Sequence, residues 1–186
     1  MFKFRRGVLV ATLCLAVAIS SAQDSAPVTF NLPGHGKLLL AVPAAWNVEV
    51  HPQPDQLAPT LELTQKNRGS FHVLLTPMWT RDTGTPFPDD AAVRNQVAAA
   101  AKLAEGQSVE RALTIRELFG KSNRGYYFTA ADRAPKPDEW KYLTQGIIRI
   151  GRVDLAFSVL TNDGQDSVIK SALGALLAAS HVPPAL

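Results

Sequence analysis

Residues 82–85 come nearest to a catalytic motif in this chain. Asp82-Thr83-Gly84-Thr85 matches the Asp-Thr-Gly-Ser/Thr loop of aspartic proteases, in which two aspartates share a proton and activate a water molecule. That loop normally follows an apolar strand, whereas here it lies between Trp79-Thr80-Arg81 and Pro86-Phe87-Pro88. A turn in a Pro/Gly-rich loop is therefore the favoured interpretation. The alternative is a hydrolase that uses Asp82 with a second carboxylate or with a histidine such as His35.

Other patterns of catalytic or metal-binding residues are missing from the sequence. Ser108 follows Gly106-Gln107 but precedes Val109-Glu110, so the Gly-x-Ser-x-Gly turn of serine hydrolases is absent. The four histidines, at positions 35, 51, 72 and 181, form no His-x-His or His-x-x-x-His pair of the kind that places two metal ligands on one face. We therefore expect no catalytic residue, no metal site and no cofactor.

Aromatic residues in irregular segments indicate a binding surface instead. The longest irregular stretch, Pro77–Pro88, contains Trp79, Arg81 and Phe87, and Trp140 borders another loop. Tryptophan and arginine are enriched at the energetic centres of protein interfaces, so these four residues are the predicted contact surface. The alternative is that each aromatic ring folds back over the edge of a sheet as part of the core.

The first 22 residues have the composition of a secretory signal peptide. Lys3, Arg5 and Arg6 precede an apolar run from Val8 to Ile19, which ends in the small residues Ser20-Ser21-Ala22. We expect cleavage near Ala22 and a periplasmic or secreted mature protein. The apolar run of about 12 residues is too short for a spanning helix, which needs roughly 20, and no later segment is longer.

The leader also accounts for the charge and the single cysteine of the chain. Three of the 19 basic residues lie in it and none of the 16 acidic ones, so residues 23–186 have no net formal charge. Nucleic-acid binding needs clustered basic residues, and we expect none here. Cys14 follows Leu13 in the middle of the apolar run, which argues against lipidation. The mature chain then has no thiol and no disulfide.

Apolar–polar alternation predicts mostly strands after the leader. Asp89 or Asp90 is expected to cap a first helix that stops at Gly106, and a second helix runs from about Gln165 to Ala179. Asn67-Arg68-Gly69 and Asn123-Arg124-Gly125 are interpreted as tight turns with a left-handed glycine and no further role. The predicted strands cover residues 28–32, 37–42, 46–50, 60–65, 71–76, 113–119, 124–132, 139–150 and 153–160.

This order gives five strands, a helix, four strands and a helix, without strand–helix alternation. It predicts an α+β fold, an antiparallel sheet covered by two amphipathic helices. The expected organisation is a signal peptide at 1–22, a flexible tether at 23–27, one domain at 28–182 and a tail at 183–186.

Short motifs within this order resemble the PsbP-like α/β/α sandwich superfamily. Phe30-Asn31-Leu32-Pro33 and Val42-Pro43-Ala44-Ala45-Trp46-Asn47-Val48 look like its opening hairpin and corner, and Gly125-Tyr126-Tyr127-Phe128 and Lys141-Tyr142-Leu143-Thr144-Gln145-Gly146 look like its later strands. The superfamily includes plant photosystem accessory proteins, Ran-binding import factors and bacterial periplasmic proteins of the DcrB type. The resemblance implies a PsbP-like sandwich and a binding or accessory role, and it transfers no functional residue.

We therefore expect an exported, non-enzymatic binding or accessory protein with a protein partner in the cell envelope. The hydrolase that uses Asp82 is the alternative. A structural protein of the envelope is a third interpretation, which the sequence does not separate from the first.

Overall fold

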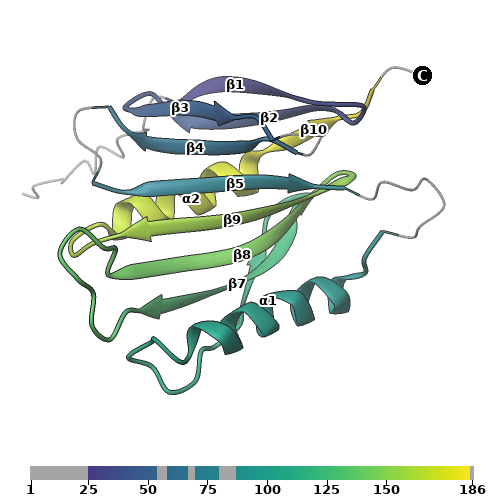
Figure 1. Cartoon of the computed structure of the whole chain (residues 1–186). Coiled ribbons are helices and arrows are strands. Elements are labelled where there is room, and N and C mark those ends of the chain that lie inside the picture. The colour runs from purple at the N-terminus through teal and green to yellow at the C-terminus, as the bar shows by residue number, and fades with distance from the viewer. Residues whose placement is uncertain (1–24, 54–57, 67–69, 80–86, 185–186) are drawn as a thin grey trace, which may run out of the picture.

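Alternating apolar residues build two antiparallel sheets, and two helices pack on them (Figure 1). The structure is a computed structural model, and it describes residues 25–53, 58–66, 70–79 and 87–184. The elements are β1 (Ser25–Leu32), β2 (Gly36–Pro43), β3 (Trp46–His51), β4 (Thr60–Gln65), β5 (His72–Met78), α1 (Asp90–Ala104), β6 (Arg116–Phe119), β7 (Arg124–Ala131), β8 (Tyr142–Ile150), β9 (Val153–Thr161), α2 (Asp166–Ala178) and β10 (Ser180–Val182).

The smaller sheet has the strand order β1-β2-β10 and differs from the sequence prediction at both chain ends. β1 begins at Ser25, inside the predicted tether, because its backbone pairs with β2 from Ser25 opposite Pro43 onward. β10 was not predicted. It pairs three residues with β2 by backbone contacts, and three residues are too few to show a period in the sequence.

The larger sheet has the order β3-β4-β5-β9-β8-β7-β6, and all its neighbouring strands are antiparallel. The predicted order of five strands, a helix, four strands and a helix is confirmed, with β10 added after α2. β3 and β6 form the two free edges of this sheet. Within the described ranges, neither helix combines the length and the apolar character needed to cross a bilayer.

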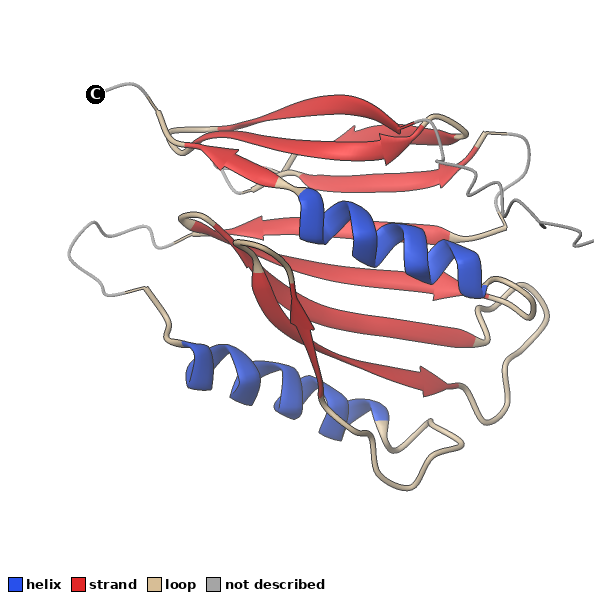
Figure 2. Ribbon diagram, turned by 180° about the vertical axis from the view of Figure 1, so that it is seen from behind, coloured by secondary structure: helices blue, strands red, loops and turns tan. Residues whose placement is uncertain are grey.

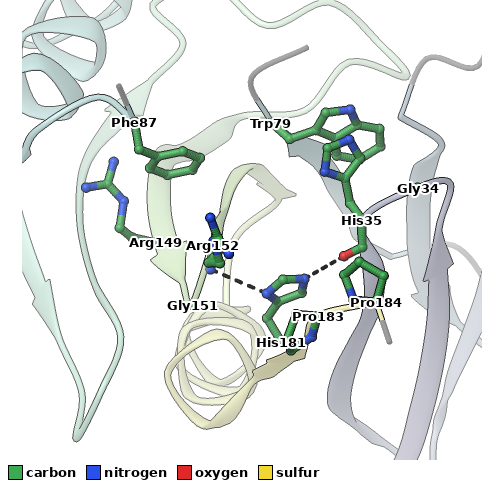
Figure 3. Close-up of a pocket in the computed structure, with 10 residues that line it drawn as sticks. All are labelled: Gly34, His35, Trp79, Phe87, Arg149, Gly151, Arg152, His181, Pro183 and Pro184. Atoms are coloured by element: carbon green, nitrogen blue, oxygen red, sulfur yellow. Dashed lines mark hydrogen bonds between the residues drawn. The ribbon is translucent and has the colours of Figure 1, made fainter. Parts of the chain in front are cut away.

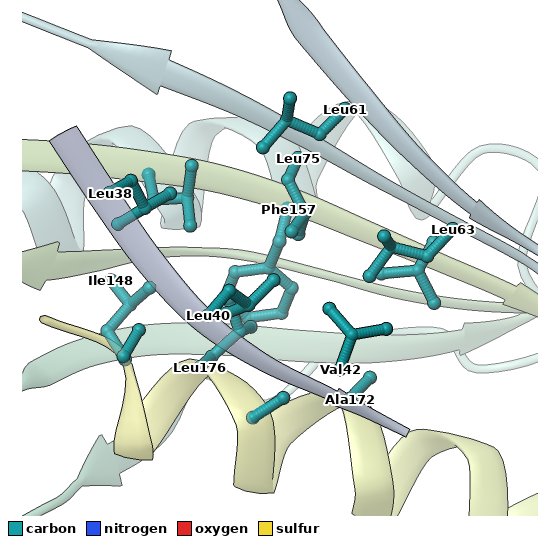
Figure 4. Close-up of a cluster of buried hydrophobic side chains, with 14 of the residues drawn as sticks. Leu38, Leu40, Val42, Leu61, Leu63, Leu75, Ile148, Phe157, Ala172 and Leu176 are labelled. Carbon is teal, nitrogen blue, oxygen red and sulfur yellow. The ribbon is translucent and has the colours of Figure 1, made fainter. Parts of the chain in front are cut away.

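The two helices pack on opposite faces of the larger sheet. Ile148 of β8 belongs to the main core with Leu176 of α2, whereas its neighbour Ile147 packs with Val97 of α1, and successive strand residues point to opposite faces. Figure 2 shows α2 in front of the larger sheet, beside the smaller one, and α1 at the far end. The main core thus fills the space between both sheets and α2 (Figure 4).

A side chain caps the N-terminal end of α1, and another caps the C-terminal end of α2. The Asp89 carboxylate accepts a hydrogen bond from the Ala92 amide at 2.7 Å, which confirms the predicted cap of α1. The buried Asn123, in the β6–β7 turn, donates from Nδ2 to the carbonyl oxygens of Leu176, Leu177 and Ala179 at 3.2, 3.1 and 2.7 Å. It therefore caps the C-terminal end of α2, and the prediction that this turn has no further role was wrong.

Gly125 was also misinterpreted as a left-handed turn residue. It lies within β7 and is not among the glycines with positive φ in the described chain. A Cβ atom at this position would lie 2.2 Å from the Ile147 carbonyl oxygen, so glycine is needed for the close approach of β7 and β8. The corresponding Asn67-Arg68-Gly69 segment lies outside the described residues.

Candidate functional site

A pocket of about 560 Å³ opens where the two sheets meet at one end of the molecule (Figure 3). This volume is in the range of small-ligand sites. The β1–β2 turn, the end of β5, the segment before α1, the β8–β9 turn and the chain after β10 all contribute to it. Its lining residues are Gly34, His35, Trp79, Phe87, Arg149, Gly151, Arg152, His181, Pro183 and Pro184.

The end of β8 and the β8–β9 turn bring Arg149 and Arg152 to the pocket. Ile150 and Val153 pair across the strands, so Gly151 and Arg152 form a two-residue hairpin loop, as the sequence predicted. Gly151 has φ 59°, a left-handed conformation that suits such loops. A Cβ atom there would also lie 3.1 Å from the His181 Cβ. Glycine therefore allows the turn to pack directly against β10.

The charge of Arg149 is already balanced within the fold. Its guanidinium donates to both carboxylate oxygens of the buried Asp154 at 2.8 and 2.9 Å, and Asp90 of α1 lies 3.7 Å away. Its carbon Cζ is 4.6 Å from the centre of the Phe87 ring, within the range of a cation–π contact. Arg149 thus holds Phe87 and the start of α1 against the sheet.

Arg152 differs from Arg149 because it is exposed and has no ion pair within the part of the chain that the structure describes. No carboxylate of the described residues lies within ion-pair distance of its guanidinium. Figure 3 shows its side chain between Phe87 on one side and Trp79 with His35 on the other. This arrangement places a cation beside apolar ring surfaces. It suits a ligand that carries an anionic group next to an apolar group.

His181 joins three of the segments that line the pocket. Its Nε2 lies 2.7 Å from the His35 carbonyl oxygen, and its Nδ1 accepts a hydrogen bond from the Arg152 amide at 3.4 Å. The neutral imidazole with its proton on Nε2 makes both hydrogen bonds. β10 therefore fixes the β1–β2 turn and the β8–β9 turn relative to each other.

His35 and Trp79 form the opposite wall. Their rings are stacked, with centroids 4.5 Å apart and an interplanar angle of 28°. Partial burial, and secondarily the nearby His181, lower the pKa of His35 below its ordinary value, because both disfavour a positive charge on the His35 ring. The neutral His35 ring is the form that the folded protein prefers.

This preference predicts a pH dependence of stability. The unfolded chain binds a proton at His35 near pH 6.5, whereas the folded protein binds it only at lower pH. The free energy of unfolding should therefore fall as the pH drops from about 6.5 towards the lowered pKa. Urea unfolding between pH 5 and 8 should show that His35→Gln loses less free energy of unfolding on acidification than the wild type does. The difference between the two proteins should appear only below about pH 6.5. Equal acid losses in both proteins would contradict the assignment.

The structure brings two of the four predicted contact residues together. Trp79 and Phe87 both line the pocket, and Trp79 also packs against the main core. Arg81 lies outside the described residues, as does Asp82 of the hydrolase alternative. Trp140 precedes β8, whose nine residues separate it from the pocket end of that strand by roughly 27 Å.

Trp140 instead borders a different hollow, of about 570 Å³. The cations of that hollow already have partners. Arg133 donates to the Ser108 carbonyl oxygen at 2.7 and 3.2 Å, and Lys136 pairs with Glu139 at 3.4 Å. The pocket beside Arg152 is therefore the stronger candidate for an anionic ligand.

Sequence reasoning missed Arg149, Arg152 and His181. Gly151-Arg152 was predicted only as a turn, and His181 stood within the last residues of the domain. The antiparallel register of β8 and β9 sets the place of both arginines, while the unpredicted β10 brings in His181. For these three residues, the predicted hairpin at Gly151-Arg152 was the one signal in the sequence.

Comparisons with known proteins give one informative result. No family model matches the chain, and no curated protein matches it. Among solved structures, the chain is similar to the solution structure of cyanobacterial PsbP (CyanoP) from Synechocystis sp. PCC 6803, with a TM-score of 0.51 and 10% sequence identity. The match covers 92% of this chain and 98% of the other. Together with the two antiparallel sheets and two helices, it shows that the chain has a PsbP-like α+β sandwich fold.

Proposed function

We propose that this protein is an exported, non-enzymatic accessory protein that holds an acidic segment of a protein partner in the pocket beside Arg152. The observation that carries the proposal is the exposed Arg152, which forms no ion pair with a carboxylate of the described residues and lies between Phe87 and Trp79. An aspartate or glutamate of the partner would pair with Arg152, and a neighbouring apolar side chain would contact the rings. Buried aromatic and arginine contacts of this kind supply most of the affinity of protein interfaces.

The proposal also includes the export of the protein and its type. The basic, apolar and small-residue pattern of residues 1–22 supports export and cleavage near Ala22. The PsbP-like fold is consistent with an accessory, non-catalytic protein, and we propose that the protein is of the DcrB type of bacterial periplasmic proteins. Mass spectrometry of the protein from its own cells should find a new N-terminus at or near Gln23 in the envelope fraction.

Pull-down with a chemical crosslinker tests the role of the pocket. The purified protein is mixed with the periplasmic and membrane fractions of its own cell, and bound proteins are identified by mass spectrometry. One reproducible partner should be captured by the wild type. Arg152→Glu should weaken its binding by at least about 30-fold, because charge reversal at an interface centre costs about 2 kcal/mol or more.

Two further variants separate binding from folding. Arg111→Glu introduces the same charge change at another exposed arginine, in the loop after α1, and should bind as the wild type does. Trp79→Ala should weaken binding too, but Trp79 packs partly on the core, so its circular dichroism and melting temperature must be compared first. A partner that binds Arg152→Glu as tightly as the wild type would refute this function for the pocket.

A further inference from the structure

Two imidazoles and two carboxylates lie together on the part of the larger sheet that α1 does not reach. α1 packs on β7 and β8. On the same face, according to the strand register, β3 presents Glu49 and His51, β4 presents Glu62 and β5 presents His72. This cluster lies on the opposite face of the sheet from the main core, and it shares no residue with the pocket beside Arg152.

The side chains of this cluster already contact one another. Ligand atoms of Glu49, His51 and Glu62 all lie within 4.8 Å of each other. Glu62 is shared between two histidines: its Oε2 lies 2.7 Å from His51 Nε2, and its Oε1 lies 2.5 Å from His72 Nδ1. The His72 ring in turn packs against Trp140, with centroids 5.2 Å apart.

The register of β3 and β4 places two negative charges next to each other in this cluster. Glu49 and Glu62 are directly opposite one another on β3 and β4, and like charges in that position destabilise a sheet. A cation between the two carboxylates would remove the repulsion. The neighbouring imidazole nitrogen of His51 makes the donor set one of mixed nitrogen and oxygen.

We propose that Glu49, His51 and Glu62 bind one divalent transition-metal ion of the zinc type. Imidazole nitrogen and carboxylate oxygen bind Zn²⁺ at about 2.0–2.2 Å, and three protein ligands leave a position for water. Ligands of one such ion lie roughly 3.4 Å apart in a tetrahedral arrangement. The exposed Glu49 and His51 side chains need only small rotations to reach that spacing. His72 is a positioning residue, because its contact with Glu62 orients a ligand from outside.

Calorimetric titration of the untagged, full-length protein with Zn²⁺, in excess Mg²⁺, tests the site. We expect one ion per chain. Glu49→Gln should weaken binding by at least about tenfold, the usual effect of a lost ligand or its supporting partner. Glu117→Gln is the matched control, because both glutamates are exposed on the two edge strands of the same sheet. It should bind Zn²⁺ as the wild type does.

The contact between His72 and Trp140 offers a second readout. Zn²⁺ binding that shifts Glu62 and His72 should change the tryptophan fluorescence, and the change should disappear in Trp140→Phe. His72→Phe should weaken binding about tenfold without changing the stoichiometry. Absence of binding below millimolar Zn²⁺ would overturn the proposal. It would equally be overturned if folded Glu49→Gln and His51→Gln both bind Zn²⁺ as tightly as the wild type, since the ion would then be adventitious.

Discussion

Replacing Asp154 by alanine is expected to lower the free energy of unfolding by about 3 kcal/mol. Asp154 is only 4% exposed and accepts two hydrogen bonds from Arg149, which lies opposite it on the neighbouring strand. Its removal leaves the Arg149 guanidinium, which is 20% exposed, with Asp90 at 3.7 Å as its remaining ion-pair partner among the described residues. A charge left without its partner in such a place is costly. Urea denaturation at neutral pH measures the loss.

Asp163→Ala is the matched control for this prediction. Asp163 also pairs with a cation, accepting from Lys141 at 2.9 Å through both oxygens, but its side chain is 72% exposed. Solvent screens exposed pairs and makes their contribution to stability small, so the control should lose little. Replacing both Arg149 and Asp154 by apolar residues should recover much of the stability. A loss in Asp154→Ala no larger than that in Asp163→Ala would contradict the role given to the pair.

Asn123→Asp is expected to destabilise the protein by about 3 kcal/mol, and Asn123→Ala by about 2 kcal/mol. Asn123 is 4% exposed, and its amide group serves three carbonyl oxygens at the C-terminal end of α2. Alanine removes the donor and leaves the carbonyls without it. Aspartate has nearly the same shape but places negative charge against those oxygens, at the helix end where the macrodipole is also negative.

Thermal and urea unfolding of both variants measure these effects. Asn162→Asp provides a control at an exposed asparagine that accepts a hydrogen bond from the Lys141 amide through its side-chain oxygen, a bond that aspartate can also accept. The loss of free energy of unfolding should be smallest in Asn162→Asp, larger in Asn123→Ala and largest in Asn123→Asp. If Asn123→Asp is as stable as the wild type, the cap does not hold α2.

The elements that the sequence predicted are those with a repeated pattern. α1 carries Val93, Val97 and Ala101 on its buried face after the Asp89 cap, and β9 alternates between buried and half-buried residues from Leu155 to Thr161. Each pattern is long enough to repeat several times, so local sequence alone indicates it. β10 and the first three residues of β1 depend instead on backbone pairing with β2, which leaves no mark on side-chain order.

The candidate site was predicted only in part for a related reason. Trp79 and Phe87 are recognisable as large aromatics in an irregular segment, and both line the pocket. Arg152 lies in a turn and His181 near the C-terminus. Only the strand pairing of the folded protein brings these two residues beside Trp79 and Phe87. In the same way, Glu49, His51 and Glu62 become neighbours through the β3–β4 register, because a search for spaced histidines along one segment does not see ligands on two strands.

Placing a photo-crosslinking amino acid at position 184 tests the central claim most directly, because Pro184 lines the pocket and its replacement leaves Arg152 in place. Position 184 and a control at the exposed position 117, on the far edge strand β6, are each replaced in turn, and the protein is produced in its own cell before irradiation. We expect a covalent adduct with one protein partner from position 184 and none with that partner from position 117. Adducts that are absent at position 184, or equal at both positions, would contradict the claim that the pocket beside Arg152 is where a partner binds.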